Sequence, residues 1–434
     1  MQEDDLVSSG TRALEQAGTE PTERGYTDLD VESVVVAHYA VTLGMSYEDI
    51  ERMMGLSRAT VARRLLHAKT KGWILPARVS VPPELKAEYV QRVECVDLEE
   101  SLEEHLRPFG LRKATVVSDK RVQNNEAYEV TARVGQAASA RLLEALDKRD
   151  RTSEPDQVVI GINWGYSTRW VVQHFPPQDS DNPDLAFVPL IGNLSVDERR
   201  TKEYEEAWLC SANRLARLAS EKFRSGDPRR LATPAIIPRS FLGDKSKLDA
   251  VWEFIEEDAS YKRIFGAGHR RGEPCGDDTL MGRMDTIITG MSALEATSSL
   301  VEMAHLLIPG ELEFLKNAGF VGDLGGHLIC DPERRVFDPD ALQLAEALGD
   351  LVVSARPEDF KAVAERAAAS DEPWKGVFMI GRGHNKAHAL VAACRMRAVT
   401  ELFTDRSTAQ AMVELLSGEP WRRGVLETAG LPSK

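Results

Sequence analysis

Residues 381–390, GRGHNKAHAL, combine glycines, a histidine and a lysine at the start of an alanine-rich stretch that is expected to be helical. A lysine in the first turn of a helix is disfavoured by the helix dipole, unless a bound anion neutralises both positive charges. Lys386 is therefore expected to hold a phosphate, whereas a surface charge and a catalytic amine are its alternative roles. His384 is expected to form a supporting hydrogen bond rather than to act as a general base.

Residues 161–168, GINWGYST, have the same arrangement of an apolar segment, glycines and then an expected helix. Gly165 lets the backbone approach a ligand closely, and Ser167 and Thr168 place hydroxyl and amide donors at a helix N-terminus, where an anion is favoured. The glycine spacing is that of neither a dinucleotide-binding loop nor a Walker A loop. An anion site and a plain tight turn both fit this segment.

Two aspartates are candidates for binding sugar hydroxyls, because a carboxylate can accept two hydrogen bonds. Asp285 opens the apolar segment DTIITGMS, and Asp323 lies in VGDLGGH, whose glycines predict an exposed turn. A loop-capping role explains each aspartate equally well when it is considered alone.

The elements that would position these residues alternate along the chain from about residue 130. Short apolar strands ending in glycine are followed by amphipathic helices, which predicts a doubly wound, mostly parallel α/β sheet covered on both faces. Ligands of such sheets bind at the carboxyl ends of the strands, where the two glycine segments fall. The polar helical stretch 338–374 is expected to be peripheral.

Residues 26–75 predict a separate all-α, winged-helix-like domain that contains a helix-turn-helix. Ser46 begins one helix that ends at Gly55, and Ser57 begins another that runs to about Gly72. The short turn between two short helices is typical of the helix-turn-helix. Segment 57–73 contains no acidic residue, and its second helix would enter the major groove of DNA. The residues expected to contact DNA are Ser57, Arg58, Thr60, Arg63, Arg64 and Lys69. A basic, solvated helix without a nucleic-acid role is the alternative.

The composition is that of an ordinary globular protein, with 434 residues, 42% hydrophobic and 28% charged. The net charge of −15 argues against DNA binding by the chain as a whole, so that role falls to the basic segment alone. No apolar run is long enough for a membrane helix and the N-terminus lacks a secretory signal, so a cytoplasmic location without membrane association is expected. Five scattered cysteines without a C-x-x-C pair predict reduced thiols, no metal site and no cofactor.

Taken in order, these motifs resemble the SorC family of bacterial sugar-responsive transcriptional regulators, which also includes deoxyribonucleoside and central glycolytic gene regulators. The matching segments span about residues 30–416. They are SYEDIERMMGLSRATVARRLLHAKTKGWI, GINWGYST, FVPLIGN, SANRLARLA, DTIITGMSAL, GFVGDLGGH, GRGHNKAHAL and LFTDRSTAQAMVELL.

The resemblance implies an effector domain with a fold similar to glucosamine-6-phosphate deaminase and ribose-5-phosphate isomerase. In that deaminase a G-H-x-K-A segment, matched here by GHNKA at 383–387, supplies a phosphate-binding lysine. It follows from the resemblance that Lys386, Ser167 and Thr168 clamp a phosphate and that acidic and amide side chains face the sugar. The full set of implied effector-binding residues is Gly165, Ser167, Thr168, Gly192, Asn193, Asn213, Asp285, Asp323, His384 and Lys386.

Three features depart from the family pattern. Glu51 stands where the helix-turn-helix usually has a small residue, and Ile191 stands where bisphosphate-binding relatives have an arginine. The chain also carries additional material at its N-terminus and around 258–283 and 338–374.

The expected domains are an acidic disordered tail (1–25), the DNA-binding domain (26–75), a linker (76–83) and an effector and oligomerisation domain (84–434). The expected function is regulation of transcription without catalysis, with operator DNA and a phosphorylated sugar or polyol as partners and a homodimer or homotetramer as the assembly. The alternative is a sugar-phosphate isomerase or deaminase that carries an accessory N-terminal domain, although its catalytic Asp–His–Glu set cannot be assembled from the motifs.

Overall fold

The structure is a computed structural model, and it divides into two compact units between Asp97 and Leu98. The predicted acidic tail lies outside the residues that the structure describes. The described residues are 26–42, 45–75, 78–79, 86–119, 126–149, 157–193, 209–226, 229–295, 306–333 and 338–418.

The first unit contains the predicted helix-turn-helix. Ser46 accepts a hydrogen bond from the Asp49 amide and begins α2 (Tyr47–Met54), and Gly55 ends it with a left-handed backbone (φ +65°). Ser57 begins α3 (Arg58–Thr70) in the same way. Helix α3 packs with α1 (Asp28–Ala37), and α2 packs with α3 and with the π-helical turn His38–Thr42 that follows α1. Their buried core includes Val31, Val34, Val35, Tyr39, Ile50, Val61, Ala68 and Trp73.

A small hairpin follows α3, so the prediction that this domain is all-α is wrong. Strand β1 (Ile74–Leu75) pairs antiparallel with β2 (Arg78–Val79). Two-residue strands leave no hydrophobic alternation to recognise, and a proline-rich segment is an unusual place for a strand. Strand β2 lies within the stretch expected to be a linker. The next helix, α4 (Lys86–Leu106), spans the division between the two units.

The second unit is built on a six-stranded sheet with the order β3-β11-β10-β6-β4-β5. Every pair of neighbouring strands is parallel, as predicted for a doubly wound α/β domain. The strands are β3 (Lys113–Val117), β4 (Val158–Ile162), β5 (Leu185–Pro189), β6 (Thr286–Gly290), β10 (Gly376–Ile380) and β11 (Glu401–Asp405).

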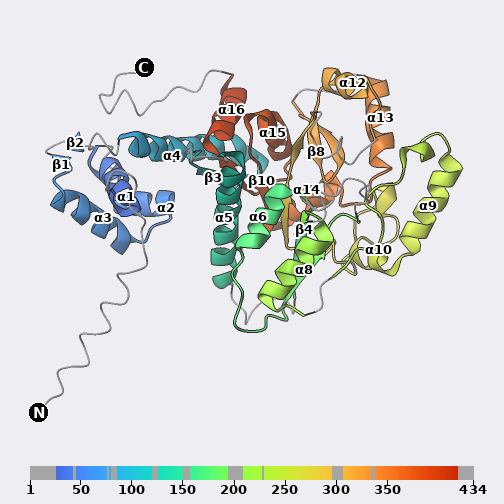
Figure 1. The fold of residues 1–434 in the computed structure, drawn as a ribbon, viewed down its shortest axis with the longest axis horizontal. Helices are drawn as coiled ribbons and strands as arrows, with labels where there is room; N and C mark the ends of the chain where they lie inside the picture. The colour runs from blue at the N-terminus through green and yellow to red at the C-terminus, as the bar shows by residue number, and fades with distance from the viewer. Residues whose placement is uncertain are drawn as a thin grey trace, which may run out of the picture. The chain divides into compact units, whose positions relative to one another are not determined.

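Helices cover both faces of this sheet because the crossovers run in two directions. The connections from β3 to β4 and from β4 to β5 carry α5 (Glu126–Asp147) and α6 (Tyr166–His174), which lie side by side (Figure 1). The usual right-handed crossover puts both helices on the same face of the sheet. Helix α8 (Ala212–Phe223) packs beside them against β4 and β5. The core on this face includes Val134, Leu142, Ile160, Ile162, Phe175, Phe187, Leu215, Phe378 and Phe403.

The connections that lead to β10 and β11 run in the opposite direction, so their helices occupy the other face. These helices are α14 (Pro357–Ala368) and α15 (Ala387–Arg395), and α16 (Arg406–Ser417), which follows β11, packs against α15. Helix α14 contacts β6 and β10 and buries Phe360 and Val363. The expectation that 338–374 is peripheral is therefore wrong for α14, whose apolar residues recur at helical spacing.

A three-stranded antiparallel sheet stands beside the carboxyl end of β6. Its order is β7 (Ser292–Ala293), β8 (Phe320–Leu324) and β9 (His327–Cys330). The remaining helical segments are Arg107–Phe109, Arg239–Phe241, α9 (Lys245–Glu257), α10 (Ala259–Ile264), His269–Arg271, α12 (Glu311–Ala318), α13 (Pro339–Gly349) and His384–Lys386. None of the helices in the described part of the chain has the length and apolarity needed to cross a membrane.

Candidate functional site

The strand order of the six-stranded sheet marks a position for a ligand between β4 and β6. These strands are neighbours, but the chain leaves β4 toward β5 and leaves β6 toward β10 on the other side. Connections that diverge in this way open a crevice at the carboxyl ends of parallel strands, and ligands of such folds bind there. Both glycine segments of the sequence follow strands that end at this edge.

Gly165 begins α6 at the end of β4. Its backbone (φ +126°, ψ 163°) lies in a region that essentially only glycine occupies, so a side chain here would strain the turn. Among the described residues, no side chain caps this helix start. The uncapped amides and the helix dipole make the first turn of α6 suitable for an anion.

The hydroxyls of the next turn lie inside the protein. Ser167 is 8% exposed and Thr168 is fully buried. The Oγ1 of Thr168 finds no hydrogen-bond partner among the residues that the structure describes. A buried hydroxyl left unpaired costs about 1–3 kcal/mol. An unpaired buried hydroxyl at the ligand-binding edge of a sheet typically forms its hydrogen bond with a ligand or an ordered water.

The GRGHNK segment follows β10, and several hydrogen bonds hold it in place. Gly383, at φ +107°, donates its amide to the Oγ1 of Thr408 over 2.8 Å. The side chain of Asn385 donates to the Oε2 of Glu295 over 2.7 Å. Because Glu295 follows β7, these bonds join the loops after β6, β10 and β11. Within the segment, Lys386 is partly buried and His384 is exposed.

The two glycine segments approach each other at Gly290, the last residue of β6. A Cβ added there would lie 3.5 Å from the Cβ of Ser167 and 3.6 Å from the carbonyl oxygen of Ile380. The turn His384–Lys386 also contacts β7, which follows Gly290. The structure thus brings Gly165, Ser167 and Thr168 to the same edge of the sheet as the segment of Lys386.

Asp323 belongs to this edge through the small sheet. Asp323 pairs across the small sheet with Ser292, which follows the end of β6 by two residues. Asp323 is 4% exposed. Its Oδ1 accepts a hydrogen bond of 3.1 Å from the amide of Gly326. The prediction of an exposed turn is wrong, because both Gly325 and Gly326 are buried. A Cβ on Gly325 would lie 2.8 Å from the carbonyl oxygen of Ala355 and 3.5 Å from the ring of Phe360.

Gly192, Asn193 and Asn213 form a separate cluster at the end of β5. The side chain of Asn213 donates to the Oδ1 of Asn193 over 3.0 Å and accepts from the amide of Leu231 over 2.9 Å. A Cβ on Gly192 would lie 2.4 Å from the carbonyl oxygen of Pro234, so this glycine permits close backbone packing. These contacts join the end of β5 to the segment 231–235.

Asp285 lies at the opposite, amino edge of the sheet. Its Oδ2 accepts a hydrogen bond of 3.0 Å from the Val159 amide, and Lys375 Nζ lies 3.9 Å from its Oδ1. Burial raises the pKa of this carboxyl group, although the Val159 hydrogen bond and Lys375 act against the rise. The five-residue strand β6 separates Asp285 from the glycine loops by about 17 Å. The structure therefore does not bring it together with Lys386 or Thr168.

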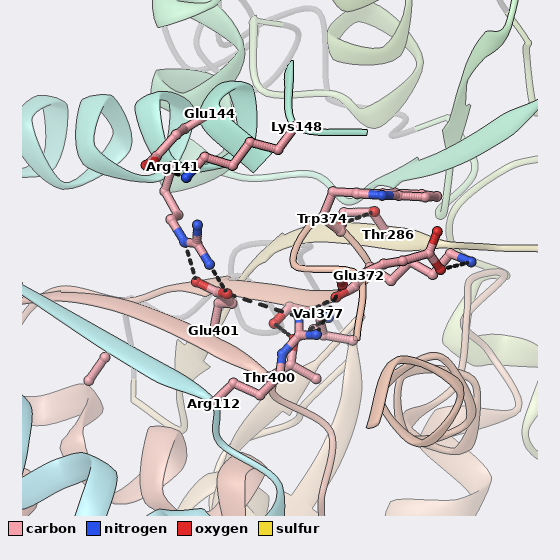
Figure 2. Close-up of polar contacts among 12 residues, drawn as sticks. Arg112, Arg141, Glu144, Lys148, Thr286, Glu372, Trp374, Val377, Thr400 and Glu401 are labelled. Atoms are coloured by element: carbon pink, nitrogen blue, oxygen red, sulfur yellow. Dashed lines mark hydrogen bonds and ion pairs between the residues drawn. The ribbon is translucent and has the colours of Figure 1, made fainter. Parts of the chain in front are cut away.

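The same amino edge carries a buried ionic network (Figure 2). Glu401, the first residue of β11, is 1% exposed and accepts hydrogen bonds of 3.1 and 2.9 Å from Arg141. Arg112 lies 4.0 Å from the same carboxylate and also donates to the carbonyl oxygen of Glu372. Burial alone would lower the pKa of Arg141, but its bonds to Glu401 raise it above its ordinary value. This network joins α5, β3 and β11 and is structural.

Several residues that shape the ligand edge were missed in the sequence. The side chain of Asn163 donates to the Oγ1 of Thr289 over 3.0 Å, which joins the ends of β4 and β6. Thr408 and Glu295 hold the GRGHNK segment, as described above. A polar residue directly after an apolar strand, as in GINWG, was the available signal for Asn163. Thr408 and Glu295 gave none, because their partners are distant in the sequence.

The first unit presents a second candidate surface along α3. Arg58 pairs with Glu48 over 3.3 Å, with both side chains exposed. Arg64 instead turns onto α1, where it pairs with Glu32 at 24% exposure. The exposed residues form one continuous face of the helix. They are Ser57, Arg58, Ala59, Ala62, Arg63, Leu66, Lys69 and Thr70.

A hydrogen-bonded cluster fixes the opposite side of α3. Asp30 and Thr27 form a capping box at the start of α1, and His67 Nε2 lies 2.8 Å from the Asp30 carboxylate. Burial would raise the pKa of Asp30, but the bonds from His67 and Thr27 outweigh it and leave the pKa below its ordinary value. The cluster therefore joins α3 to the start of α1 on the side opposite its exposed face.

Comparisons with known proteins agree with this geometry. Residues 90–240 match the family model described as "Putative sugar-binding domain". The sequence matches none of the curated proteins compared with it. The structure is similar to the full-length sorbitol operon regulator SorC from Klebsiella pneumoniae, with 17% identity, a TM-score of 0.50 and coverage of 88% of this chain and 99% of that chain.

A probable sor operon regulator from Shigella flexneri is also similar, at 16% identity and a TM-score of 0.50, over 74% of this chain and 99% of that chain. At these identities the likeness establishes the fold. The comparisons confirm, at the level of the fold, the resemblance to the SorC family that the ordered motifs indicated. This chain therefore carries a match to the sugar-binding domain family within residues 90–240 and has the fold of the SorC regulator.

Proposed function

We propose that this protein is a transcriptional regulator whose affinity for operator DNA is set by a phosphorylated sugar or polyol. The observation that carries the proposal is the pairing, in one chain, of a basic helix-turn-helix face with an uncapped helix start at the switch point of a parallel sheet. The similar Klebsiella protein is a sorbitol operon regulator, which supports the same class of function.

In the proposed effector site, the amides of α6 with Ser167 and Thr168 bind the phosphate, and Lys386 neutralises its charge. Asp323 accepts hydrogen bonds from sugar hydroxyls, and His384 lies beside the site. We leave Asp285 out because it lies at the other edge, and we assign the cluster of Gly192, Asn193 and Asn213 to the architecture of the loop after β5. An isomerase or deaminase needs a carboxylate base at its substrate, so the position of Asp285 also weakens that alternative.

In the proposed DNA complex, the exposed face of α3 enters the major groove. Arg63 and Arg58 are placed to contact guanine or phosphate, Ser57 and Thr60 lie at the helix start, and Lys69 follows the backbone. Arg64 is left out of the base contacts because it holds α3 to α1. The protein would act as a homo-oligomer in the cytoplasm, since two half-sites one helical turn apart require paired recognition helices.

The proposal is tested by titrating labelled promoter DNA with the full-length protein at low salt, with and without a panel of phosphorylated sugars. The expected result is binding that falls as salt rises and that one member of the panel changes reproducibly. Absence of DNA binding under every condition would show that the protein is not a regulator of this kind.

Arg63→Ala is expected to weaken operator binding by about 1–3 kcal/mol if Arg63 reads a base, and to lower the salt slope by about one charge if it contacts phosphate. The measurement is fluorescence anisotropy over a range of salt concentrations. Arg217→Ala removes the same charge from the exposed surface of α8 and serves as the control. Equal affinities for the two variants would contradict the assignment of α3 to DNA.

Thr168→Val is expected to raise the free energy of unfolding of the ligand-free protein by about 1 kcal/mol, because it removes a buried hydroxyl that lacks a partner. The same change should weaken binding of the sugar phosphate, since the hydroxyl would no longer meet the anion. Denaturant unfolding measures the first effect, and calorimetric titration with the effector measures the second. A destabilised variant with unchanged ligand affinity would show that the hydroxyl has a structural role instead.

A further inference from the structure

Three potential metal ligands converge where the segment after α10 meets the start of α14. They are His269, Cys275 and Asp359, and their ligand atoms all lie within 4.8 Å of one another. The Nε2 of His269 is 2.8 Å from the Oδ2 of Asp359, and the Sγ of Cys275 is 3.8 Å from its Oδ1. Among the residues that the structure describes, this is the one such group of histidine, cysteine and acidic side chains.

The donor types and their spacing fit a zinc ion. Imidazole nitrogen, thiolate sulfur and carboxylate oxygen are the three donors that zinc takes in proteins, at about 2.0–2.3 Å in tetrahedral geometry. Ligand atoms at the corners of such a tetrahedron are roughly 3.3–3.8 Å apart. Cys275 Sγ lies 3.8 Å from Asp359 Oδ1, at the top of this range, whereas His269 Nε2 and Asp359 Oδ2, at 2.8 Å, are hydrogen-bonded to each other and would move apart by about 0.5 Å to admit the ion. All three ligand atoms already lie within 4.8 Å of one another.

The surroundings orient each ligand. The hydroxyl of Tyr261 lies 3.2 Å from His269 Nδ1, the second ring nitrogen, and can accept a hydrogen bond from it once Nε2 binds a metal. The His269 ring stacks on Phe265 with centroids 4.5 Å apart. Asp359 accepts a hydrogen bond of 2.7 Å from the Arg356 amide at the start of α14, which fixes its carboxylate.

Access to the group is from one side. The side chains of His269 and Asp359 are 3% and 11% exposed. Cys275 is partly buried in a loop whose other residues, 272–274 and 276–278, are exposed. An ion can therefore enter beside Cys275, and a water molecule can reach the remaining coordination position.

We propose that His269, Cys275 and Asp359 bind one zinc ion, with a water molecule as the fourth ligand. The thiol proton leaves as the sulfur binds the metal. The ion would tie the loop after α10, which lies in one of the stretches that departs from the SorC pattern, to α14. Helix α14 contacts β6 and β10, so the tie reaches the central sheet. This proposal is independent of the DNA and sugar-phosphate sites.

The test is competition between the full-length, metal-free protein and a chromophoric zinc chelator. The wild type is expected to take up one equivalent of zinc, and Cys275→Ser to bind at least about 100-fold more weakly, since even outer-shell changes cost 10–100-fold. Cys330→Ser, which changes another partly buried thiol outside the group, should bind like the wild type. Tyr261→Phe should weaken binding by roughly 10–100-fold without removing a ligand.

Cobalt(II) provides a second readout, because a cobalt–thiolate bond gives a charge-transfer absorption band. The band is expected in the wild type and in Cys330→Ser but not in Cys275→Ser. Thermal melts of the metal-free proteins establish that the variants are folded. If Cys275→Ser fails to fold, Asp359→Asn, which keeps an oxygen to cap α14, replaces it in the competition assay. Equal zinc affinity in the wild type and the folded variant, or no zinc uptake by the wild type, overturns the proposal.

Discussion

Lys386→Ala is expected to remove about half or more of the stabilisation that the cognate sugar phosphate gives to this protein. A ligand at about 100 times its dissociation constant adds about 2.7 kcal/mol to the free energy of unfolding. A hydrogen bond to a charged group contributes about 1.5–3 kcal/mol, so its loss weakens binding by roughly 10- to 100-fold. At the same ligand concentration the stabilisation would then fall to between about 0.4 and 1.4 kcal/mol.

The measurement is a thermal-shift panel of phosphorylated sugars and polyols, with the unphosphorylated sugars in parallel. Lys316→Ala removes a lysine from the surface of α12, where it pairs with Glu313, and should respond like the wild type. Only phosphorylated compounds are expected to stabilise the protein. A normal response of Lys386→Ala would place the phosphate elsewhere, and DNA binding by the ligand-free variant should be unchanged in either case.

Glu401→Gln is expected to lower the free energy of unfolding by about 3 kcal/mol, at the lower end of the range for breaking a buried ion pair. The carboxylate is 1% exposed, whereas the side chains of Arg141 and Arg112 remain 23% and 27% exposed, which moderates the loss. The substitution would leave two guanidinium groups near each other without their shared anion. Denaturant unfolding followed by circular dichroism measures the change.

The matched control is Glu144→Gln, on the same helix as Arg141. Glu144 pairs with Lys148 over 2.6 Å at the surface, where both side chains are more than half exposed. An exposed pair of this kind contributes less than about 1 kcal/mol. If the two variants lost equal stability, the network at the amino edge (Figure 2) would not be the anchor that its burial indicates.

Local features of the chain were predictable because they depend on neighbouring residues. Ser46 and Ser57 begin α2 and α3 by accepting hydrogen bonds from backbone amides three residues later, and Gly55 ends α2 with a left-handed backbone. Each of these residues lies next to the helix end that it determines. The glycine-ended strands likewise predicted a parallel sheet and its ligand edge. The short hairpin β1–β2 escaped prediction because two residues carry no periodicity.

Long-range pairing determines where several of the predicted residues lie and what they contact. Arg64 has the sequence context of a DNA contact, yet its partner Glu32 lies in another helix. Asp285 lies next to a strand that ends at the ligand edge, but it precedes that strand, and β6 separates it from the edge. Asn213 and Asn193 face each other across 20 positions of the chain.

The sequence alone therefore establishes the helix-turn-helix and the strand–glycine–helix units, since each follows from local backbone preferences and spacing, and it predicts which residues have phosphate-binding chemistry. The grouping of those residues depends on strand order and helix packing, which arise from burial of apolar faces between distant segments. Cys275 shows the difference most clearly. In the sequence it is an isolated thiol, and in the fold it lies 3.8 Å from Asp359, 84 positions away, because α14 packs on the central sheet and carries that carboxylate to it.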